Sequence, residues 1–376
     1  MKHSALLLIL AATACAPGLA QRLRVTETAG IRRFNYPVTA KLWPNLPAGP
    51  LRLEEEGKPV ASQFQGEEID FNVSLGPYEQ REFTVRTEMP HSPFRLDQAI
   101  VREEGENFLV GYTPNLQFAV PRNLLGFLSS VKTSRWDYLR PGSQGLLLRY
   151  RDDILYRVGG WGPHGAPTRA RLVKQGPLSS VLEFSSTEGL RGSRSVPSLV
   201  RFEFPRSKSW AKTTWTVEDP EGFLSGLGLE LNLNIEGEPA LVDFGGSSMV
   251  YGQLRSGQAA ALIGGPQSWR VLLGPTAALE PYVAAERGLA EGWAHLMDRQ
   301  RCTAVAVEDF GRRQDRIEAD AQGRLQIWRE FRGAGPKSLT FWLHFVSMPV
   351  QVGAATSPQS MLAPLKVEWL PWNPKN

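Results

Sequence analysis

Cysteine is almost absent from this sequence. The 376 residues include two cysteines, Cys15 and Cys302, and Cys15 lies in an N-terminal segment with the layout of a signal peptide. Removal of that segment leaves Cys302 alone and excludes an internal disulfide, so stability has to come from a hydrophobic core. Cys302 lies in the apolar run CTAVAV and no GxSxG motif occurs. We therefore predict a buried cysteine and neither a cysteine nor a serine nucleophile.

Long hydrophobic runs are also few. The N-terminus, MKHSALLLILAATACAPGLAQ, has a charged start, an apolar run over residues 5–14 and small residues up to Ala20. The run is too short to span a bilayer, and this layout predicts a signal peptide over residues 1–20 that is cleaved after Ala20. Lipidation of Cys15 is the alternative. We expect a periplasmic or extracellular protein with no integral membrane segment.

Histidine is scarce, and basic residues are scattered. The five histidines, His3, His91, His164, His295 and His344, show no HxH or HExxH spacing, so we predict no metal site and no cofactor. The formal net charge is +4, and no basic run is long enough to follow a phosphate backbone. We therefore predict no nucleic-acid partner. The arginines are interpreted as solvated surface, with affinity for acidic polysaccharides as the alternative.

No long segment holds a convincing helical stripe of apolar residues. Residues 277–291 come nearest, but Pro281 and Gly288 interrupt them. Short runs with apolar residues at every second position occur throughout, which is typical of strands with one buried face. The clearest are residues 22–26, 69–75, 81–86, 199–204, 211–218, 227–235 and 339–345. The sequence therefore predicts an all-β protein.

A domain boundary is predicted near residues 88–94 (EMPHSPF), where two prolines and small polar residues separate strand-like runs. Residues 21–90 suffice for a small β-sandwich. Residues 94–376 hold too many strands for one ordinary sandwich, which predicts two large stacked sheets. Residues 365–370 are expected to form a last edge strand that docks back on the body.

Residues 291–311 (EGWAHLMDRQRCTAVAVEDFG) gather several acids and bases around Cys302. Two alternating runs flank residues 298–301, which predicts a hairpin with a solvated four-residue charged turn. His295, on the first strand, is a candidate catalytic residue if its face borders a cleft.

Several short motifs carry a resemblance to known proteins. They are AGIRRFNYPVTAKLWPNLPAGPLRLEEEGKPVASQF (29–64), IDFNVSLGPYEQREFTV (69–85), VKQGPLSSVLEF (173–184) and SLVRFEFPRSKSWAKTTWTVED (198–219). The first two resemble the opening β module of exo-acting rhamnogalacturonan lyases and, more loosely, β regions of α-mannosidases. The others are similar to stretches of a galactose-mutarotase-like supersandwich. The resemblance implies an all-β chain in which a small N-terminal β-sandwich precedes such a supersandwich.

The resemblance also implies a setting of complex carbohydrate. In such proteins the β modules accompany a helical or α/β catalytic domain, for which this sequence has no room. We therefore expect a carbohydrate-binding or polysaccharide-processing accessory protein, with a separate catalytic protein as its partner. A self-sufficient polysaccharide lyase or a mutarotase-like sugar epimerase is the enzyme alternative, and a structural or protein-interaction module is the third.

The glycine-rich residues 156–170 (YRVGGWGPHGAPTRA) predict an irregular exposed loop, and such loops on rigid sheets tend to hold binding groups. Trp161 offers an indole face for stacking on a sugar ring. Arg169 suits pairing with a uronate. His164 is a candidate catalytic acid or base near neutral pH. The alternative is a structural turn whose tryptophan covers the edge of the core.

Residues 134–140 (SRWDYLR) form the second candidate binding segment. Arg135, Trp136, Asp137 and Tyr138 combine aromatic, acidic and basic groups in one turn, which suits carbohydrate recognition. A strand end with mixed faces is the alternative. Asp137 has no identifiable carboxylate partner in the sequence, so the two-carboxylate geometry of a glycosidase is not predicted.

Sugar epimerases of the mutarotase type need a base and an acid on opposite sides of the sugar ring. His164, His295 and His344 are the histidine candidates, and the sequence selects no partner glutamate. Trp342 and His344 share one face of residues 339–345. We interpret that face as an ordinary outer face, with a concave ligand-lining surface as the alternative.

Overall fold

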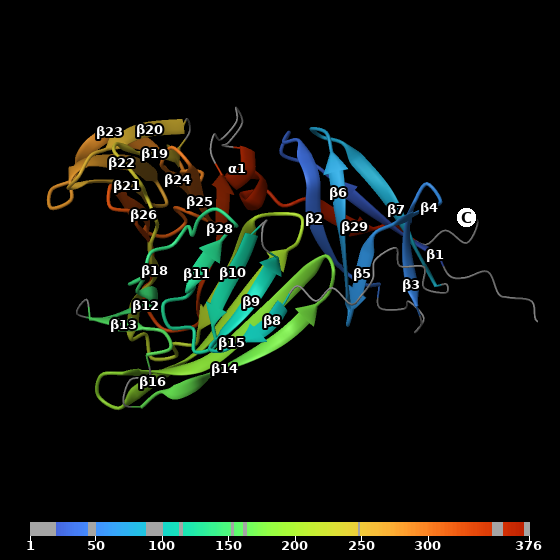
Figure 1. Ribbon diagram of the computed structural model, residues 1–376, viewed down its shortest axis with the longest axis horizontal. Helices are drawn as coiled ribbons and strands as arrows, with labels where there is room; N and C mark the ends of the chain where they lie inside the picture. The colour runs from blue at the N-terminus through green and yellow to red at the C-terminus, as the bar shows by residue number, and fades with distance from the viewer. Residues whose placement is uncertain are drawn as a thin grey trace, which may run out of the picture.

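A computed structural model describes residues 20–43, 50–87, 101–112, 116–151, 154–160, 164–246, 249–347 and 356–371. Strands dominate these ranges, which hold one short helix, α1 (Thr356–Leu362). A small sandwich lies beside a larger body of stacked sheets (Figure 1). The predicted class, an all-β chain with a small N-terminal sandwich followed by a large supersandwich, is confirmed. Within the described ranges no helix is both long and apolar enough to cross a membrane.

Two sheets form the small sandwich. The strands are β1 (Ala20–Thr26), β2 (Arg33–Lys41), β3 (Leu51–Glu55), β4 (Lys58–Val60), β5 (Ser62–Gln65), β6 (Glu68–Leu75), β7 (Gln80–Thr87) and β29 (Lys366–Trp369). One sheet has the order β29-β1-β7-β3-β4 and the other β2-β6-β5. Alternating apolar residues of both sheets meet in a core, where the rings of Phe71 and Phe83 lie 4.9 Å apart.

The C-terminal strand belongs to this small sandwich. β29 pairs antiparallel with β1, with Val367 opposite Val25, at one edge of the five-stranded sheet. The expectation of a last edge strand is confirmed, but the strand docks on the N-terminal sandwich, whereas the sequence placed residues 94–376 together in the large domain. The chain therefore passes from the small body to the large one and returns. The predicted boundary at residues 88–94 lies outside the described residues.

Three sheets form the large body. Its first strands are β8 (Val101–Glu104), β9 (Asn107–Tyr112), β10 (Leu116–Pro121), β11 (Ser130–Lys132), β12 (Gly145–Tyr150), β13 (Leu155–Arg157), β14 (Ala166–Gln175), β15 (Ser179–Leu190), β16 (Arg194–Pro205) and β17 (Trp210–Val217). They are followed by β18 (Leu224–Asn232), β19 (Ala240–Gly245), β20 (Met249–Leu254), β21 (Gln258–Gly264), β22 (Ser268–Pro275), β23 (Glu280–Arg287), β24 (Trp293–Met297), β25 (Arg301–Val307), β26 (Asp315–Asp320), β27 (Arg324–Glu330) and β28 (Lys337–Ser347).

The largest sheet has nine strands in the order β14-β15-β16-β17-β28-β25-β24-β19-β20. An eight-stranded sheet, β13-β12-β18-β27-β26-β21-β22-β23, and a four-stranded sheet, β11-β10-β9-β8, complete the body. One continuous core contains buried apolar residues of all three sheets. Phe341 and Phe345 of β28, for example, meet Phe127 and Phe118. The clearest strands predicted from alternation are all present.

The opposite face of the nine-stranded sheet is partly covered by α1. Met361 of α1 packs with Trp210, Trp293 and Trp342, which project from that face. Trp342 is 8% exposed. This face is therefore not the ordinary outer face that the sequence suggested, because α1 and the small sandwich lie over it (Figure 1).

The hairpin predicted around residues 298–301 is confirmed by the pairing of β24 with β25. The turn is solvated only at its tip: Arg299 and Gln300 are exposed as expected, whereas Asp298 and Arg301 are 3% and 2% exposed and correct the prediction for these two residues. The Arg301 guanidinium donates to the Asp298 carboxylate at 2.9 Å and lies 3.1 Å from Glu236. These ion pairs offset part of the free-energy cost of removing the two charges from water. Cys302 is buried, as predicted.

Candidate functional site

A cleft of about 300 Å³ lies between the small sandwich and the outer face of the nine-stranded sheet. Strands β2 and β6 supply one wall, β16, β17 and β28 supply the other, and Met361 of α1 also lines it. A volume of this size is typical of small-molecule sites. The aromatic lining residues are Tyr36, Phe71, Phe204, Trp210 and Trp342, and the charged ones are Glu68, Asp70, Lys174, Arg201, Glu203 and Lys212.

Lys212 lies over the indole ring of Trp342 in this cleft. The two residues are opposite each other on β17 and β28, and Lys212 Nζ lies 5.3 Å from the ring centroid. This distance is within the range of a cation–π interaction. Lys212 is half-buried, and no carboxylate of the described residues forms an ion pair with it. Its positive charge is therefore available to a ligand.

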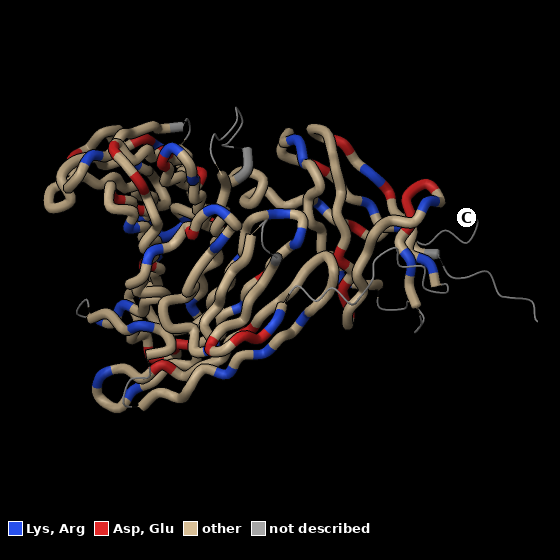
Figure 2. Tube along the Cα trace, in the orientation of Figure 1, with Lys and Arg blue, Asp and Glu red and all other residues tan. Residues whose placement is uncertain are grey.

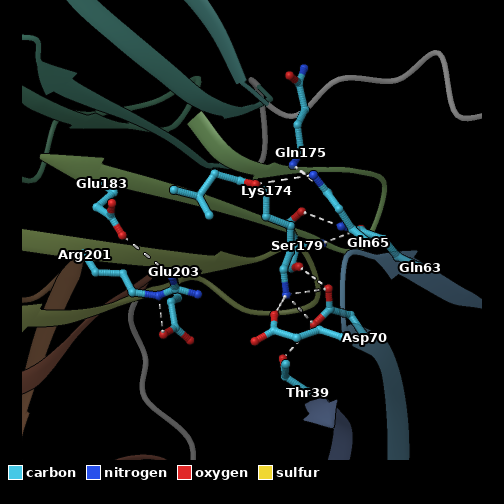
Figure 3. A network of polar contacts seen from close by, with 12 residues as sticks. Thr39, Gln63, Gln65, Asp70, Lys174, Gln175, Ser179, Glu183, Arg201 and Glu203 are labelled. Atoms are coloured by element: carbon cyan, nitrogen blue, oxygen red, sulfur yellow. Dashed lines mark hydrogen bonds and ion pairs between the residues drawn. The ribbon is translucent and has the colours of Figure 1, made fainter. Parts of the chain in front are cut away.

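Arg201, on β16, is paired with carboxylates of the same sheet face. Its Nε donates to Glu203 Oε1 at 3.4 Å, and its Nη1 lies 4.0 Å from Glu183 Oε2 (Figure 3). Because Glu203 lies opposite Lys212 in the β16–β17 pair, a ligand beside Lys212 would also meet hydrogen-bond acceptors and donors of this cluster. The arrangement combines a free cation with polar groups of both signs.

Lys174 joins the large sheet to the small sandwich at the same cleft. Its Nζ lies 2.5 Å from Glu68 Oε2 and 3.0 Å from Asp70 Oδ2 of β6. Asp70 also accepts hydrogen bonds from Thr39 Oγ1 at 2.6 Å and Ser179 Oγ at 2.7 Å (Figure 3). Lys174 and Asp70 are buried, and their charges are satisfied by each other. This group, the Lys174–Asp70 clamp, is a structural contact between the two bodies.

Gln63 of β5 connects the small sandwich to the large body beside the Lys174–Asp70 clamp. Its Oε1 accepts from the backbone N–H groups of Leu178 and Ser179 at 3.0 and 3.1 Å. Gly176 makes this approach possible, because a Cβ at that position would lie 2.2 Å from Gln63 Cδ. Side-chain-to-backbone contacts of this kind fix the relative position of the two bodies, so the cleft is preformed.

His295 and His344 lie on the same sheet face as Trp342. Both are opposite Ala304 of β25. His295 is buried, with its Nδ1 2.7 Å from Asp243 Oδ1. Burial, with a smaller effect of the nearby His295 and Lys208, lowers the pKa of His344 to about 3. A carboxylate-held histidine near a neutral imidazole has the chemistry of a proton-transfer group.

The same side chains also include possible metal ligands. Among the described residues no group of three or more His, Cys, Asp and Glu side chains is placed to hold a metal ion. The pair of His295 with Asp243 is thus a two-residue contact.

The residues predicted in the glycine-rich loop lie away from the cleft. Trp161 falls outside the described residues. His164 and Arg169 are exposed; His164 precedes β14 and Arg169 lies in its first half, whereas Lys174, near its end, lines the cleft. Arg169 is five residues from Lys174 along this strand, which corresponds to roughly 17 Å. The binding role of this loop stays a prediction, separate from the cleft.

The second predicted segment forms a tight turn. Arg135 is exposed and Trp136 is half-buried against the core. The Asp137 carboxylate accepts two backbone N–H groups of the turn at 3.1 Å each, and Tyr138 is 2% exposed. None of these four residues is among the described residues that line the cleft. Asp137 and Tyr138 therefore have evident structural contacts, and a binding role for Arg135 and Trp136 stays a prediction.

Sequence reasoning missed the cleft residues Lys212 and Arg201. Alternation shows which side chains of a strand leave the core, but not whether the outward face meets solvent or a second domain. One signal was present. Trp210 and Trp342 occupy outward positions of alternating strands, where a solvated face rarely carries tryptophan.

Comparisons with known proteins agree with the fold. A protein of glycosyl hydrolase family 38 from Enterococcus faecalis superposes with a TM-score of 0.63 at 9% identity, over 94% of this chain and 47% of that chain. An alpha-mannosidase from the same species superposes with a TM-score of 0.61 at 9% identity, over 95% and 46%. The chain thus spans about half the length of these solved proteins, and at this identity the likeness shows the fold alone.

A galactose mutarotase related enzyme from Lactobacillus acidophilus aligns with a TM-score of 0.37 at 11% identity, over 65% of this chain and 99% of that chain. No protein-family model and no curated protein matches the sequence.

Proposed function

We propose that this protein binds a carbohydrate in the cleft and holds there a sugar residue that carries a negative charge. The observation that carries the proposal is Lys212, whose ammonium group lies over the Trp342 ring and forms no ion pair with a carboxylate of the described residues, although Glu203 is opposite it on β16. A carboxylate of a uronate would form that ion pair. Tyr36 and Trp210 add aromatic surface, which suits the apolar face of a sugar ring.

Export and an accessory role belong to the same proposal. The signal-like residues 1–20 support export, with cleavage after Ala20 as the expected step and lipidation of Cys15 as the alternative. The short resemblance of residues 29–64 and 173–184 to exo-rhamnogalacturonan lyases supports pectic sugars as the first ligands to test. In this account the protein delivers or holds polysaccharide for a separate catalytic protein.

Tryptophan fluorescence offers a direct test, because Trp210 and Trp342 line the cleft. We expect a glycan array to identify bound acidic oligosaccharides, and the bound oligosaccharide to change the emission in a saturable titration. Binding of neutral sugars alone would contradict the role of Lys212. If no glycan binds, the carbohydrate proposal fails.

A second candidate function is an enzyme of the lyase or epimerase type. Its support is the pair of His295 with Asp243, together with His344 on the same face. Incubation with uronate polysaccharides would release unsaturated products if the protein were a lyase, and these absorb in the ultraviolet. An epimerase would change the optical rotation of a free sugar. Activity that survives His295→Ala would remove this pair from the reaction.

A further inference from the structure

Two exposed aromatic side chains lie on the small sandwich, and one of them, Phe34, is beside the cleft. Phe34 and Tyr78 are 76% and 72% exposed, the highest values among the exposed large apolar side chains of the described residues. We propose that Phe34 and Tyr78 form a second sugar-binding platform, so that the ligand is a saccharide chain and not a single sugar. This inference rests on the proposed function of the cleft.

The backbone projects Phe34 out of β2. The register of β2 with β6 shifts between Arg33 and Tyr36, and Asn35 within that irregularity has a φ of +45°. Bulges of this kind re-aim side chains and are frequent beside binding sites. Phe34 is thereby directed away from the core that its neighbours in β2 join.

Tyr78 is held on a backbone that its residue type disfavours. Its φ is +58°, a conformation that is costly for a bulky side chain and that clusters at functional positions. The ring lies against Gly30, where an added Cβ would be 2.7 Å from the tyrosine hydroxyl. One side of the Tyr78 ring therefore contacts Gly30, while most of the side chain is exposed to solvent.

One buried carboxylate connects the two loops. Glu27 accepts hydrogen bonds from the backbone N–H groups of Gly30 at 2.7 Å and Tyr78 at 3.2 Å. It also pairs with Arg33 at 3.0 Å, next to Phe34 in the chain. Both aromatic residues are thus attached to one rigid anchor, which reduces the entropy lost when a ligand binds.

The Phe34 side of the platform is continuous with the cleft. Lys208 Nζ donates to the carbonyl oxygen of Phe34 at 2.7 Å and lies 5.6 Å from the ring centroid of Trp210. Trp210 lines the cleft, as does Tyr36, two residues after Phe34. A saccharide with one sugar unit beside Lys212 can therefore extend outward over the aromatic side chains of Trp210, Tyr36 and Phe34.

A saccharide suits this platform better than a protein partner. Protein interfaces centre on a contiguous apolar core, whereas here two separate rings are set among polar groups such as Arg32 and Asn35, which are exposed. Separate aromatic faces beside hydrogen-bonding groups match a chain of pyranose rings, each with an apolar face and hydroxyl groups at its edge.

Chain-length dependence tests this inference. The probes are oligogalacturonides and hyaluronan-derived oligosaccharides, each as disaccharide and hexasaccharide, titrated by calorimetry. We expect Phe34→Ala and Tyr78→Ala each to weaken hexasaccharide binding roughly five- to tenfold and to leave disaccharide binding unchanged. Tyr282→Ala, which removes an exposed ring of β23 far from the cleft, serves as the matched control and should change neither.

The possible results separate the inference from the proposed function. If the variants lose the same affinity for the disaccharide and the hexasaccharide, the platform proposal is wrong. It is also wrong if they lose no affinity for a hexasaccharide that the wild-type protein binds. Neither result contradicts the proposed function of the cleft. The second of these results would point to a protein partner instead. If the wild-type protein binds none of the probes, the cleft proposal and the platform fail together.

A second variant separates a binding role of Tyr78 from a structural one. Tyr78→Gly relieves the positive φ, so its melting temperature should be at or above that of the wild-type protein. The same variant should lose hexasaccharide affinity as Tyr78→Ala does. A Tyr78→Gly protein that melts lower yet binds the hexasaccharide normally would show that the tyrosine serves the fold.

Discussion

At the scale of single residues, a buried ion pair links the first strands of the small sandwich to α1. Glu27 and Arg33 both have fully buried side chains. Arg33 donates to the carbonyl oxygens of Ser360 and Ala363 at 2.6 Å each. The pair thereby ties α1 to the N-terminal strands, across more than three hundred residues of chain.

The substitution Glu27→Gln should destabilise the protein. It removes the negative charge and leaves Arg33 buried with carbonyl partners only, which costs about 3 kcal/mol in the free energy of unfolding. Burial raises the pKa of Glu27, but hydrogen bonds from Arg33 and from backbone N–H groups outweigh it and hold the pKa below its usual value. The stabilisation is therefore present above pH 4.5 and is lost as the pH falls further.

Urea unfolding at neutral pH measures this cost. Glu82→Gln is a suitable control, because Glu82 pairs with Arg24 in a partly exposed position, where an ion pair contributes little. A Glu27→Gln protein as stable as the control variant would contradict the role given to the buried pair.

His344 should make the protein less stable in mild acid. Its pKa is about 3 in the folded protein, whereas an unfolded histidine titrates near 6.5. The unfolded chain therefore takes up the proton first, and stability falls by about 1 kcal/mol per pH unit as the pH decreases from about 6 to about 3. His344→Phe, which keeps an aromatic ring beside Trp210, should have a flatter pH profile over this window in thermal melts. If melting temperature falls with pH equally in the wild-type and His344→Phe proteins, the low pKa assigned to His344 is refuted.

At the scale of elements, the sequence predicted strands well and their partners poorly. The hairpin of β24 and β25 follows from local alternation and a polar turn. Asp298 accepts a hydrogen bond from the backbone N–H of Glu236, and Arg301 donates to the carbonyl oxygen of Asp137. Both partners lie far from the turn in the chain, so no local pattern predicts the burial. β29 was expected as an edge strand, but its partner β1 lies at the other end of the sequence.

Removal of β29 should loosen the small sandwich selectively. A chain that ends after Ala363 retains the carbonyl contacts of Arg33 with Ser360 and Ala363 and loses one of the two strand partners of β1. We expect amide hydrogens of β1 to exchange faster while those of β25 and β28 keep their protection. A chain that ends after Pro371 retains β29 and serves as the control. Unchanged exchange in β1 would show that β29 contributes nothing to the sheet.

The cleft residues could not be predicted from the sequence for a similar reason. Lys212 and Trp342 lie at outward positions of β17 and β28, and the period of a strand does not report what lies over that face. The charge clusters are spread over many elements (Figure 2), so runs of charge in the sequence do not mark the site. His164 and Arg169 were favoured because glycine-rich loops are visible in a sequence, whereas a cleft between domains is not.

At the scale of the whole molecule, two chain passages and the Lys174–Asp70 clamp join the small sandwich to the large body. We expect the described bodies to unfold together in one cooperative transition. Lys174→Met leaves Asp70 buried beside Glu68 without a cation, so it should cost about 3 kcal/mol and separate the unfolding of the two bodies in calorimetry. Lys41→Met, at an exposed position of β2, is the control. A single transition of unchanged midpoint in the Lys174→Met protein would contradict the clamp.

Lys212 is proposed to bind the charged group of a saccharide in a preformed cleft. Calorimetric titration of the wild-type protein and of Lys212→Met with oligogalacturonides and with their methyl-esterified, neutral counterparts measures its contribution. Lys58→Met, at an exposed position of β4, controls for the loss of one positive charge. We predict that Lys212→Met lowers affinity for the acidic ligand roughly tenfold and removes the preference over the neutral ligand, while Lys58→Met changes neither. Equal affinity of the wild-type and Lys212→Met proteins for the acidic ligand would contradict the account.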